Sequence, residues 1–202
     1  AGVLVVLLAV IIIPSSYLAQ VQGYRPVQTA PIMLLAALPQ LIALPLVAAL
    51  CNLRWVDCRW VLGIGLSMLT LSCIGGSQLT SVWIRDDFYV LQLLQIFGQP
   101  MAVLPLLMLS TGSISPMEGP FASAWFNTVK GLAAVIATGV LEALTTSRLH
   151  FHSVMLVDSL GNSPLVDSDS AGLAHRLHEQ AVVLTASDLY LCMAGVALAL
   201  IL

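Results

Sequence analysis

Long apolar stretches recur along the chain, and short polar segments separate them. About six of these stretches approach or exceed the roughly 20 residues that an α-helix needs to cross a bilayer, and they hold few charges. They cover residues 2–20, 30–51, 60–78, 88–110, 121–147 and 181–202. The pattern therefore predicts an all-α fold in which residues 1–202 form a single domain, a polytopic transmembrane bundle of about six helices.

The composition also indicates a membrane protein. The sequence has 202 residues, of which 59% are hydrophobic and only 8% are charged. Soluble domains carry about 25% charged residues, so a lipid bilayer is the expected environment of this chain. The formal net charge of −3 and the lack of a basic patch exclude a nucleic-acid partner. Because the chain begins inside an apolar run without an initiating Met, we interpret it as an excerpt of a longer protein.

Three glutamines share one face of the fourth predicted helix. Gln92, Gln95 and Gln99 are spaced i, i+3 and i+7. An unpaired amide in hydrocarbon costs several kcal/mol, so this face must contact other helices or a water-filled cavity. Pro100 and Pro105 follow and favour a kink. A solute path is one interpretation of the glutamine face, and a hydrogen-bonded seam between helices is the other.

Charged and strongly polar residues also occur inside the last two predicted helices. Asn127, Lys130 and Glu142 lie in the fifth and Asp188 lies in the sixth. Such residues at membrane depth are functional candidates. Lys130 and Glu142 are twelve residues apart, about 18 Å along a helix, so they cannot pair with each other. The alternative for Asp188 is an acid near the helix N-terminus that faces headgroup water and the helix dipole.

Residues 148–180 are predicted to form the one long extramembrane loop. A Ser or Asp near residues 167–170 is expected to cap a helix that starts near Ala171. The loop holds all four histidines, which are His150, His152, His175 and His178. Two histidine pairs could gather a metal, but nothing in the sequence brings the pairs together, so solvated surface histidines are the favoured interpretation. We therefore predict neither a metal nor another cofactor.

The sequence gives no indication of an enzyme, because it lacks the common catalytic signatures. The sequence contains no HExxH, GxSxG or paired-carboxylate motif. The cysteines lie in or beside apolar runs without CxxC spacing, so we interpret them as small buried hydrophobic residues rather than as a disulfide or metal site. These cysteines are Cys51, Cys58, Cys73 and Cys192.

Short motifs then follow one another in a familiar order along nearly the whole chain. They are Tyr17-Leu18-Ala19-Gln20-Val21-Gln22-Gly23-Tyr24-Arg25-Pro26, Leu38-Pro39, Val56-Asp57-x-Arg59-Trp60, Phe126-Asn127-x-x-Lys130-Gly131, Phe151-His152, and Gln180-Ala181 with Ser187-Asp188-Leu189-Tyr190. The ordered set resembles the C-terminal half of a drug:proton antiporter of the major facilitator superfamily. The most similar branch is the fourteen-helix one that includes the EmrB and QacA transporters.

This resemblance implies a fold of two six-helix bundles with the transport path between them, of which this chain is one. It implies proton-coupled efflux of amphipathic drugs or toxic compounds by alternating access in the bacterial cytoplasmic (inner) membrane. The expected partners are the missing N-terminal half, the substrate, protons and a periplasmic adaptor protein, which the long loop would contact.

The resemblance also implies roles for individual residues. The substrate path would be lined by Gln92, Gln95, Gln99 and Asn127. Charge coupling would involve Lys130, Glu142 or Asp188. The loop before the third predicted helix, with Arg54, Asp57 and Arg59, would take part in gating, although Cys51 and Cys58 stand where that motif carries glycines.

A non-transporting membrane scaffold or assembly subunit is the alternative function. It would explain the small residues of the third predicted helix, which let helices approach closely, and it needs no coupling acid. These residues are Gly63, Gly65, Gly75 and Gly76. A scaffold predicts that Gln92→Leu and Asp188→Asn leave cellular activity unchanged, whereas a transporter would lose efflux or coupling.

The orientation in the membrane depends on which evidence is followed. Arginines are more numerous on the side of residues 148–180, which the positive-inside rule would place in the cytoplasm. The family resemblance places that side outside. We follow the resemblance, because long loops weigh little in that rule. Cysteine labelling at Ser168 of intact and lysed cells would test this choice.

Overall fold

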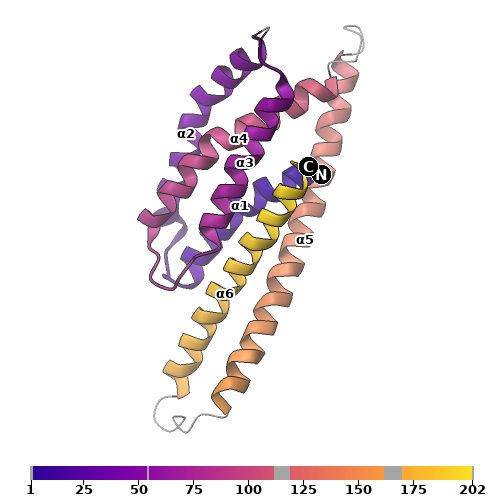
Figure 1. Cartoon of the computed structure of the whole chain (residues 1–202). Helices are drawn as coiled ribbons and strands as arrows, with labels where there is room; N and C mark the ends of the chain where they lie inside the picture. The colour runs from indigo at the N-terminus through magenta and orange to yellow at the C-terminus, as the bar shows by residue number, and fades with distance from the viewer. Residues whose placement is uncertain (1, 54, 112–118, 162–169, 202) are drawn as a thin grey trace.

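The computed structural model describes residues 2–53, 55–111, 119–161 and 170–201. These residues form helices and connections without a strand, so the predicted all-α class is confirmed. The elements in chain order are α1 (Gly2–Gln20), α2 (Pro26–Cys51), α3 (Cys58–Gly76), the 3-10 turn η1 (Arg85–Asp87), α4 (Phe88–Thr111), α5 (Gly119–Gly161) and α6 (Ser170–Ala199), as Figure 1 shows.

Five of the described helices are long and apolar enough to cross a membrane. They are α1, α3, α4, α5 and α6, and α2 adds a shorter apolar stretch at Ala37–Cys51. An α-helix satisfies its own backbone hydrogen bonds, which is what lipid requires of a spanning segment. The chain is therefore a multi-pass membrane protein built as an all-α helical bundle.

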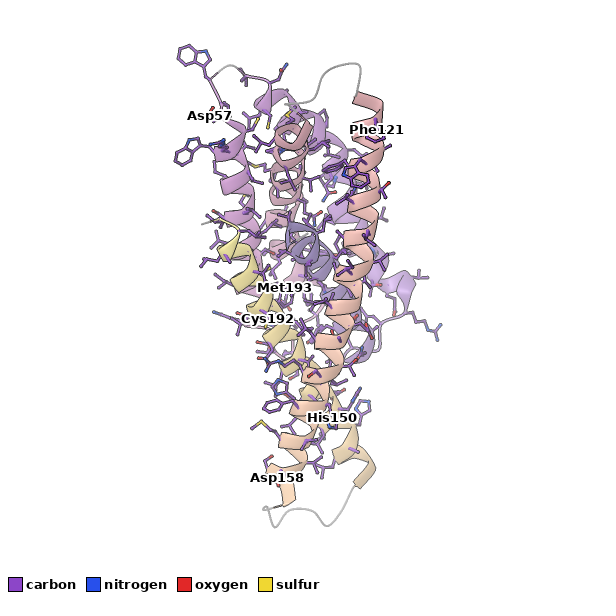
Figure 2. The ribbon with its side chains drawn as sticks, turned by 90° about the vertical axis from the view of Figure 1, so that its right-hand side faces the viewer. Asp57, Phe121, His150, Asp158, Cys192 and Met193 are labelled. Carbon is purple, nitrogen blue, oxygen red and sulfur yellow. The ribbon has the colours of Figure 1, made fainter. Side chains whose placement is uncertain are left out.

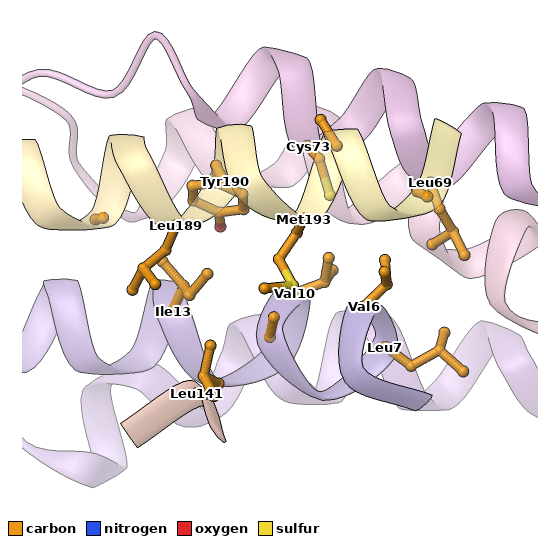
Figure 3. Packing of buried hydrophobic residues seen from close by; sticks show 14 of the residues in the cluster. Val6, Leu7, Val10, Ile13, Leu69, Cys73, Leu141, Leu189, Tyr190 and Met193 are labelled. Carbon is orange, nitrogen blue, oxygen red and sulfur yellow. The ribbon is translucent and has the colours of Figure 1, made fainter. Parts of the chain in front are cut away.

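The core lies where α6 crosses α1 and α3. Val6 and Val10 of α1, Met193 of α6 and Leu69 of α3 belong to one buried cluster, in which Met193 points toward Val10 (Figure 3). All four side chains are almost fully buried. The helices α3 and α4 pack along each other, and α2 covers the outer side of α4. The helix α5 contacts mainly α6 and α1.

Glycine permits two very close helix contacts. A Cβ atom at Gly65 would lie 2.6 Å from the backbone carbon of Met101 in α4. A Cβ atom at Gly76 would lie 2.8 Å from the ring of Tyr190 in α6. In lipid, packing rather than hydrophobicity drives helix association, so these contacts help to fix α3 between α4 and α6.

The prediction of a loop is wrong for residues 148–161, which continue α5, whereas the helix predicted to start near Ala171 is present. The helix α5 has 43 residues and continues to Gly161, and α6 begins at Ser170. The physical reason is an amphipathic pattern: Thr145, Leu149, His152 and Leu156 are partly buried at spacings of three and four residues. Intervening polar residues lower the hydropathy of these turns without breaking the helix.

These helical parts project beyond the other helices (Figure 1). We call residues 148–161 of α5 and 170–180 of α6 the projecting end. Its extramembrane position stays a prediction. The predicted helix start near Ala171 agrees within one residue with Ser170. The expected capping residues at 167–169 and the labelling position Ser168 lie outside the described residues.

Candidate functional site

A cavity of about 310 Å³ lies between α1, α5 and α6. Its lining combines aliphatic side chains with hydroxyl groups, one amide and one carboxylate. The lining residues are Ile12, Ile13, Ser16, Tyr17 and Gln20 of α1, Thr138, Leu141, Glu142, Thr145, Thr146 and Leu149 of α5, and Val182, Thr185, Ala186 and Leu189 of α6. This volume lies at the lower end of the range for small-molecule sites, and the mixed lining suits an amphipathic ligand.

Glu142 carries the only charge among the described lining residues. Its side chain is exposed, so it stands at the open side of the cavity, and no ion pair joins it to another described residue. The described part of the lining includes no lysine, arginine or histidine. The electrostatic character of the cavity is therefore negative, which favours a ligand with a positive charge.

The threonines of the cavity present oxygen acceptors. Thr138, Thr145 and Thr185 each donate their hydroxyl hydrogen to the carbonyl of the residue four positions earlier, at 2.9, 2.7 and 2.7 Å. Such back-bonding satisfies the donor and leaves the oxygen lone pairs available. A ligand with hydrogen-bond donors would therefore find acceptors on both α5 and α6.

Tyr17 fixes one wall of the cavity to the connection between α3 and α4. Its ring is 1% exposed, and its hydroxyl donates to the Thr80 carbonyl at 2.7 Å. The neighbouring Gln22 donates to the carbonyls of Ser81 and Trp83 at 3.1 and 3.2 Å. The end of α1 and this connection are thus held together by hydrogen bonds from two side chains.

A cluster of three ionisable residues lies beside the cavity. Nε2 of His152 is 2.9 Å from Oδ2 of Asp188, and the guanidinium of Arg148 is 3.6 Å from the same oxygen. Arg148 and His152 are one turn apart on α5, and Asp188 faces them from α6. Leu149 and Leu189, which are sequence neighbours of the cluster, line the cavity. We call Arg148, His152 and Asp188 the ion cluster.

The sequence singled out Asp188 but missed the roles of Arg148 and His152. Both were assigned to a loop, where side-chain directions cannot be predicted. Their i, i+4 spacing was the available signal, because it places two side chains on one face of a helix. Only the packing of α5 on α6 brings that face to Asp188.

The glutamine face lies at helix contacts rather than in the cavity. Nε2 of Gln95 donates to Oγ of Ser72 in α3 at 3.1 Å, and Nε2 of Gln40 in α2 donates to Oε1 of Gln99 at 2.7 Å. Gln92 is 3% exposed. These contacts favour the interpretation as a seam between helices, and a solute path along the glutamines stays a prediction.

The other predicted site residues are dispersed. Asn127 and Lys130 are exposed on α5, far along the helix from Glu142. Asp57 is the N-cap residue of α3 and Arg59 is exposed in its first turn, while Arg54 lies outside the described residues. The structure thus brings together Glu142 and the cavity, with Asp188 beside them, and leaves the predicted gating loop at the opposite end of the bundle (Figure 2).

The four cysteines are free, and their burial differs. Cys51 and Cys73 are buried as predicted, whereas Cys192 is exposed. Within the described residues, no group of three His, Cys, Asp or Glu side chains is arranged to hold a metal ion.

The fold and the cavity define a multi-pass membrane protein with an amphipathic, negatively charged site between three of its helices. No protein-family model matches the chain, and no curated protein matches it.

Proposed function

We propose that this chain is one half of a transporter that exports amphipathic compounds in exchange for protons by alternating access. The observation that carries the proposal is the cavity between α1, α5 and α6, in whose described lining Glu142 is the only charged residue. A scaffold needs no such site, because a carboxylate beside hydrocarbon is costly unless it serves a ligand or a proton. The family resemblance adds the transporter type, a major facilitator antiporter of the bacterial inner membrane.

The substrate class follows from the lining of the cavity. Aliphatic walls accept an apolar body, and Glu142 attracts a positive charge at its edge. Amphipathic cations are therefore the preferred substrates.

The outer surface of α5 supports the need for a second bundle. Only 11% of its most apolar stretch is buried, compared with 39% to 56% in α1, α3, α4 and α6. Asn127 and Lys130 are exposed on this helix between Trp125, Val129 and Leu132, which are exposed as well. An ammonium group within a spanning helix requires protein or water around it. The N-terminal half of the transporter would supply that cover.

The test is export of ethidium, a planar amphipathic cation, by cells that express the protein containing this chain. Glu142→Gln is expected to reduce export by at least tenfold at unchanged expression, whereas Glu142→Asp retains part of it. Asp158→Asn is the matched control, because it removes an exposed carboxylate near the projecting end of α5 (Figure 2). Full export by Glu142→Gln would contradict the proposal.

The scaffold remains a second candidate because of the amide contacts. Gln95 with Ser72 and Gln40 with Gln99 join α4 to its two neighbours, as a purely structural bundle would require. This function predicts that Glu142→Gln and Asp188→Asn leave cellular activity unchanged, while Gln95→Leu alters assembly. Measurement of ethidium export and of membrane assembly for the same three variants separates the two functions.

A further inference from the structure

The ion cluster has the geometry of a site that binds a proton on a histidine. A carboxylate only accepts hydrogen bonds, so the 2.9 Å contact requires that Nε2 of His152 carry the hydrogen. The other ring nitrogen, Nδ1, is then the acceptor in the neutral imidazole. We propose that His152 binds and releases a proton at Nδ1, while Asp188 and Arg148 hold the ring and the carboxylate in position.

Burial of the three side chains suits this exchange. The side chain of His152 is 14% exposed, that of Asp188 is 32% exposed and that of Arg148 is 45% exposed. The His152 side chain is therefore largely shielded from bulk water, whereas the side chains of Asp188 and Arg148 are partly exposed to it. Histidine is also the side chain whose charge changes in the physiological pH range.

The charges around His152 come from the helices packed on each side. Its own helix contributes Arg148, and α6 contributes Asp188. Ser187, which precedes Asp188 on α6, carries no charge. Its hydroxyl donates a hydrogen bond to the Ser77 carbonyl. From α1, the cavity wall presents Tyr17 and Gln20, which are neutral.

The next carboxylates are more distant. Asp158, which is exposed, follows His152 by six residues on α5, about 9 Å along the helix. Glu142 precedes His152 by ten residues, and Glu179 on α6 pairs with His175 at 3.3 Å. Ten helical residues correspond to about 15 Å. The cluster therefore has no net charge when His152 is neutral and one positive charge when His152 is protonated.

This charge couples the cluster to the cavity, an inference that rests on the proposed function. A cation held at Glu142 and an imidazolium at residue 152 repel each other across about 15 Å. With an effective dielectric constant of about 20, the repulsion corresponds to a change in affinity of about fivefold. Binding of a cationic substrate would thus favour release of the proton from His152, which is the exchange that an antiporter needs.

The first experiment measures binding of tetraphenylphosphonium to the full chain in lipid nanodiscs, with empty nanodiscs subtracted. Affinity is expected to rise about fivefold from pH 5.5 to pH 7.5, and binding at pH 6 should release protons, detected as heat that depends on the ionisation enthalpy of the buffer. Tetraphenylborate, an anion of the same shape, should show the opposite pH trend or no binding.

The variant His152→Gln keeps an N–H donor for Asp188 but cannot titrate. It should bind the probe with a smaller pH dependence than the wild type and release fewer protons. His150→Gln is the matched control, because His150 is exposed on the same helix two residues earlier and has no ion pair among the described residues (Figure 2). A pH dependence that survives in His152→Gln, or that disappears equally in His150→Gln, would overturn the inference.

The second experiment uses nitrogen NMR of histidine-labelled protein to determine which ring nitrogens of His152 carry a hydrogen. In the wild type, the neutral His152 ring should carry its hydrogen at Nε2, and this preference should be lost in Asp188→Ala. A ring that stays neutral from pH 4.5 to pH 8 overturns the proton site even if no probe binds. If the site titrates as expected but the protein exports nothing along a proton gradient, the proposed function fails and the proton site stands.

Discussion

Amide side chains in this bundle form hydrogen bonds between neighbouring helices. The sequence placed Gln92, Gln95 and Gln99 on one helix face, which follows from spacing alone. It could not tell which helix would meet that face, because the partners Ser72 and Gln40 are 23 and 59 residues away from the glutamines that they contact. A polar residue in a membrane helix thus predicts that a partner exists, while its identity depends on tertiary packing.

The contact between Gln95 and Ser72 should be a measurable but small contributor to stability. In a double-mutant cycle with Gln95→Leu and Ser72→Ala, we expect a coupling energy of about 0.6 kcal/mol, because hydrogen bonds between membrane helices also find substitutes in the unfolded state. Unfolding in SDS measures the four free energies. A coupling energy of zero within error would show that the 3.1 Å contact contributes nothing.

Gly65 is the residue where a single methyl group should matter most. Gly65→Ala would place a Cβ 2.6 Å from the backbone of Met101, so we expect a loss of about 1–3 kcal/mol from the free energy of unfolding. Gly63→Ala is the matched control, since a Cβ there meets no heavy atom within 4 Å. It should be neutral or slightly stabilising, because alanine favours helix. Equal stability of both variants in SDS unfolding would contradict the close contact.

Helix bounds could be predicted well only where hydropathy changes sharply. The predicted span at residues 2–20 coincides with α1, and the span at 88–110 ends one residue before α4 does. The C-terminal end of α5 was missed because its turns alternate apolar with polar and charged residues. An amphipathic helical pair and a polar loop have similar average hydropathy, so periodicity rather than composition carries the distinction.

The helical character of residues 148–160 can be tested with nitroxide labels. Single cysteines are introduced along this segment after the four native cysteines have been replaced. Accessibility to oxygen and to a nickel chelate should vary with a period of about 3.6 residues, with minima at Leu149, His152 and Leu156. Uniform accessibility along the segment would support a loop. High nickel accessibility at the maxima would in addition support its position outside the membrane.

Among the five described helices that are long and apolar enough to cross a membrane, α5 is the least covered by the rest of the bundle. The sequence indicated polar residues there but could not show that they remain uncovered after folding. Neither the cavity nor the ion cluster could be predicted from the sequence, because each combines side chains from helices that are distant in the sequence. Glu142 and Asp188 were proposed singly, and only the packing of α1, α5 and α6 relates them.

Lys130 should matter to the complete transporter and not to this bundle alone. Lys130→Leu is expected to change the unfolding free energy of the isolated chain by less than about 0.5 kcal/mol, because the side chain is exposed. In cells that express the complete protein, the same variant should lose ethidium export, while Lys130→Arg retains it. Unimpaired export by Lys130→Leu would argue against a role for the ammonium group at the contact with the other half.

The projecting end offers an attachment point for a marker that would help electron microscopy of this chain. At 21.4 kDa, the chain is too light to be aligned reliably in micelles by itself. A compact helical domain fused between Gly161 and Ser170, in continuous helix with both arms, would act as a rigid fiducial marker. Particle images aligned on that marker would reveal directly whether a tetraphenylphosphonium molecule occupies the space next to Glu142.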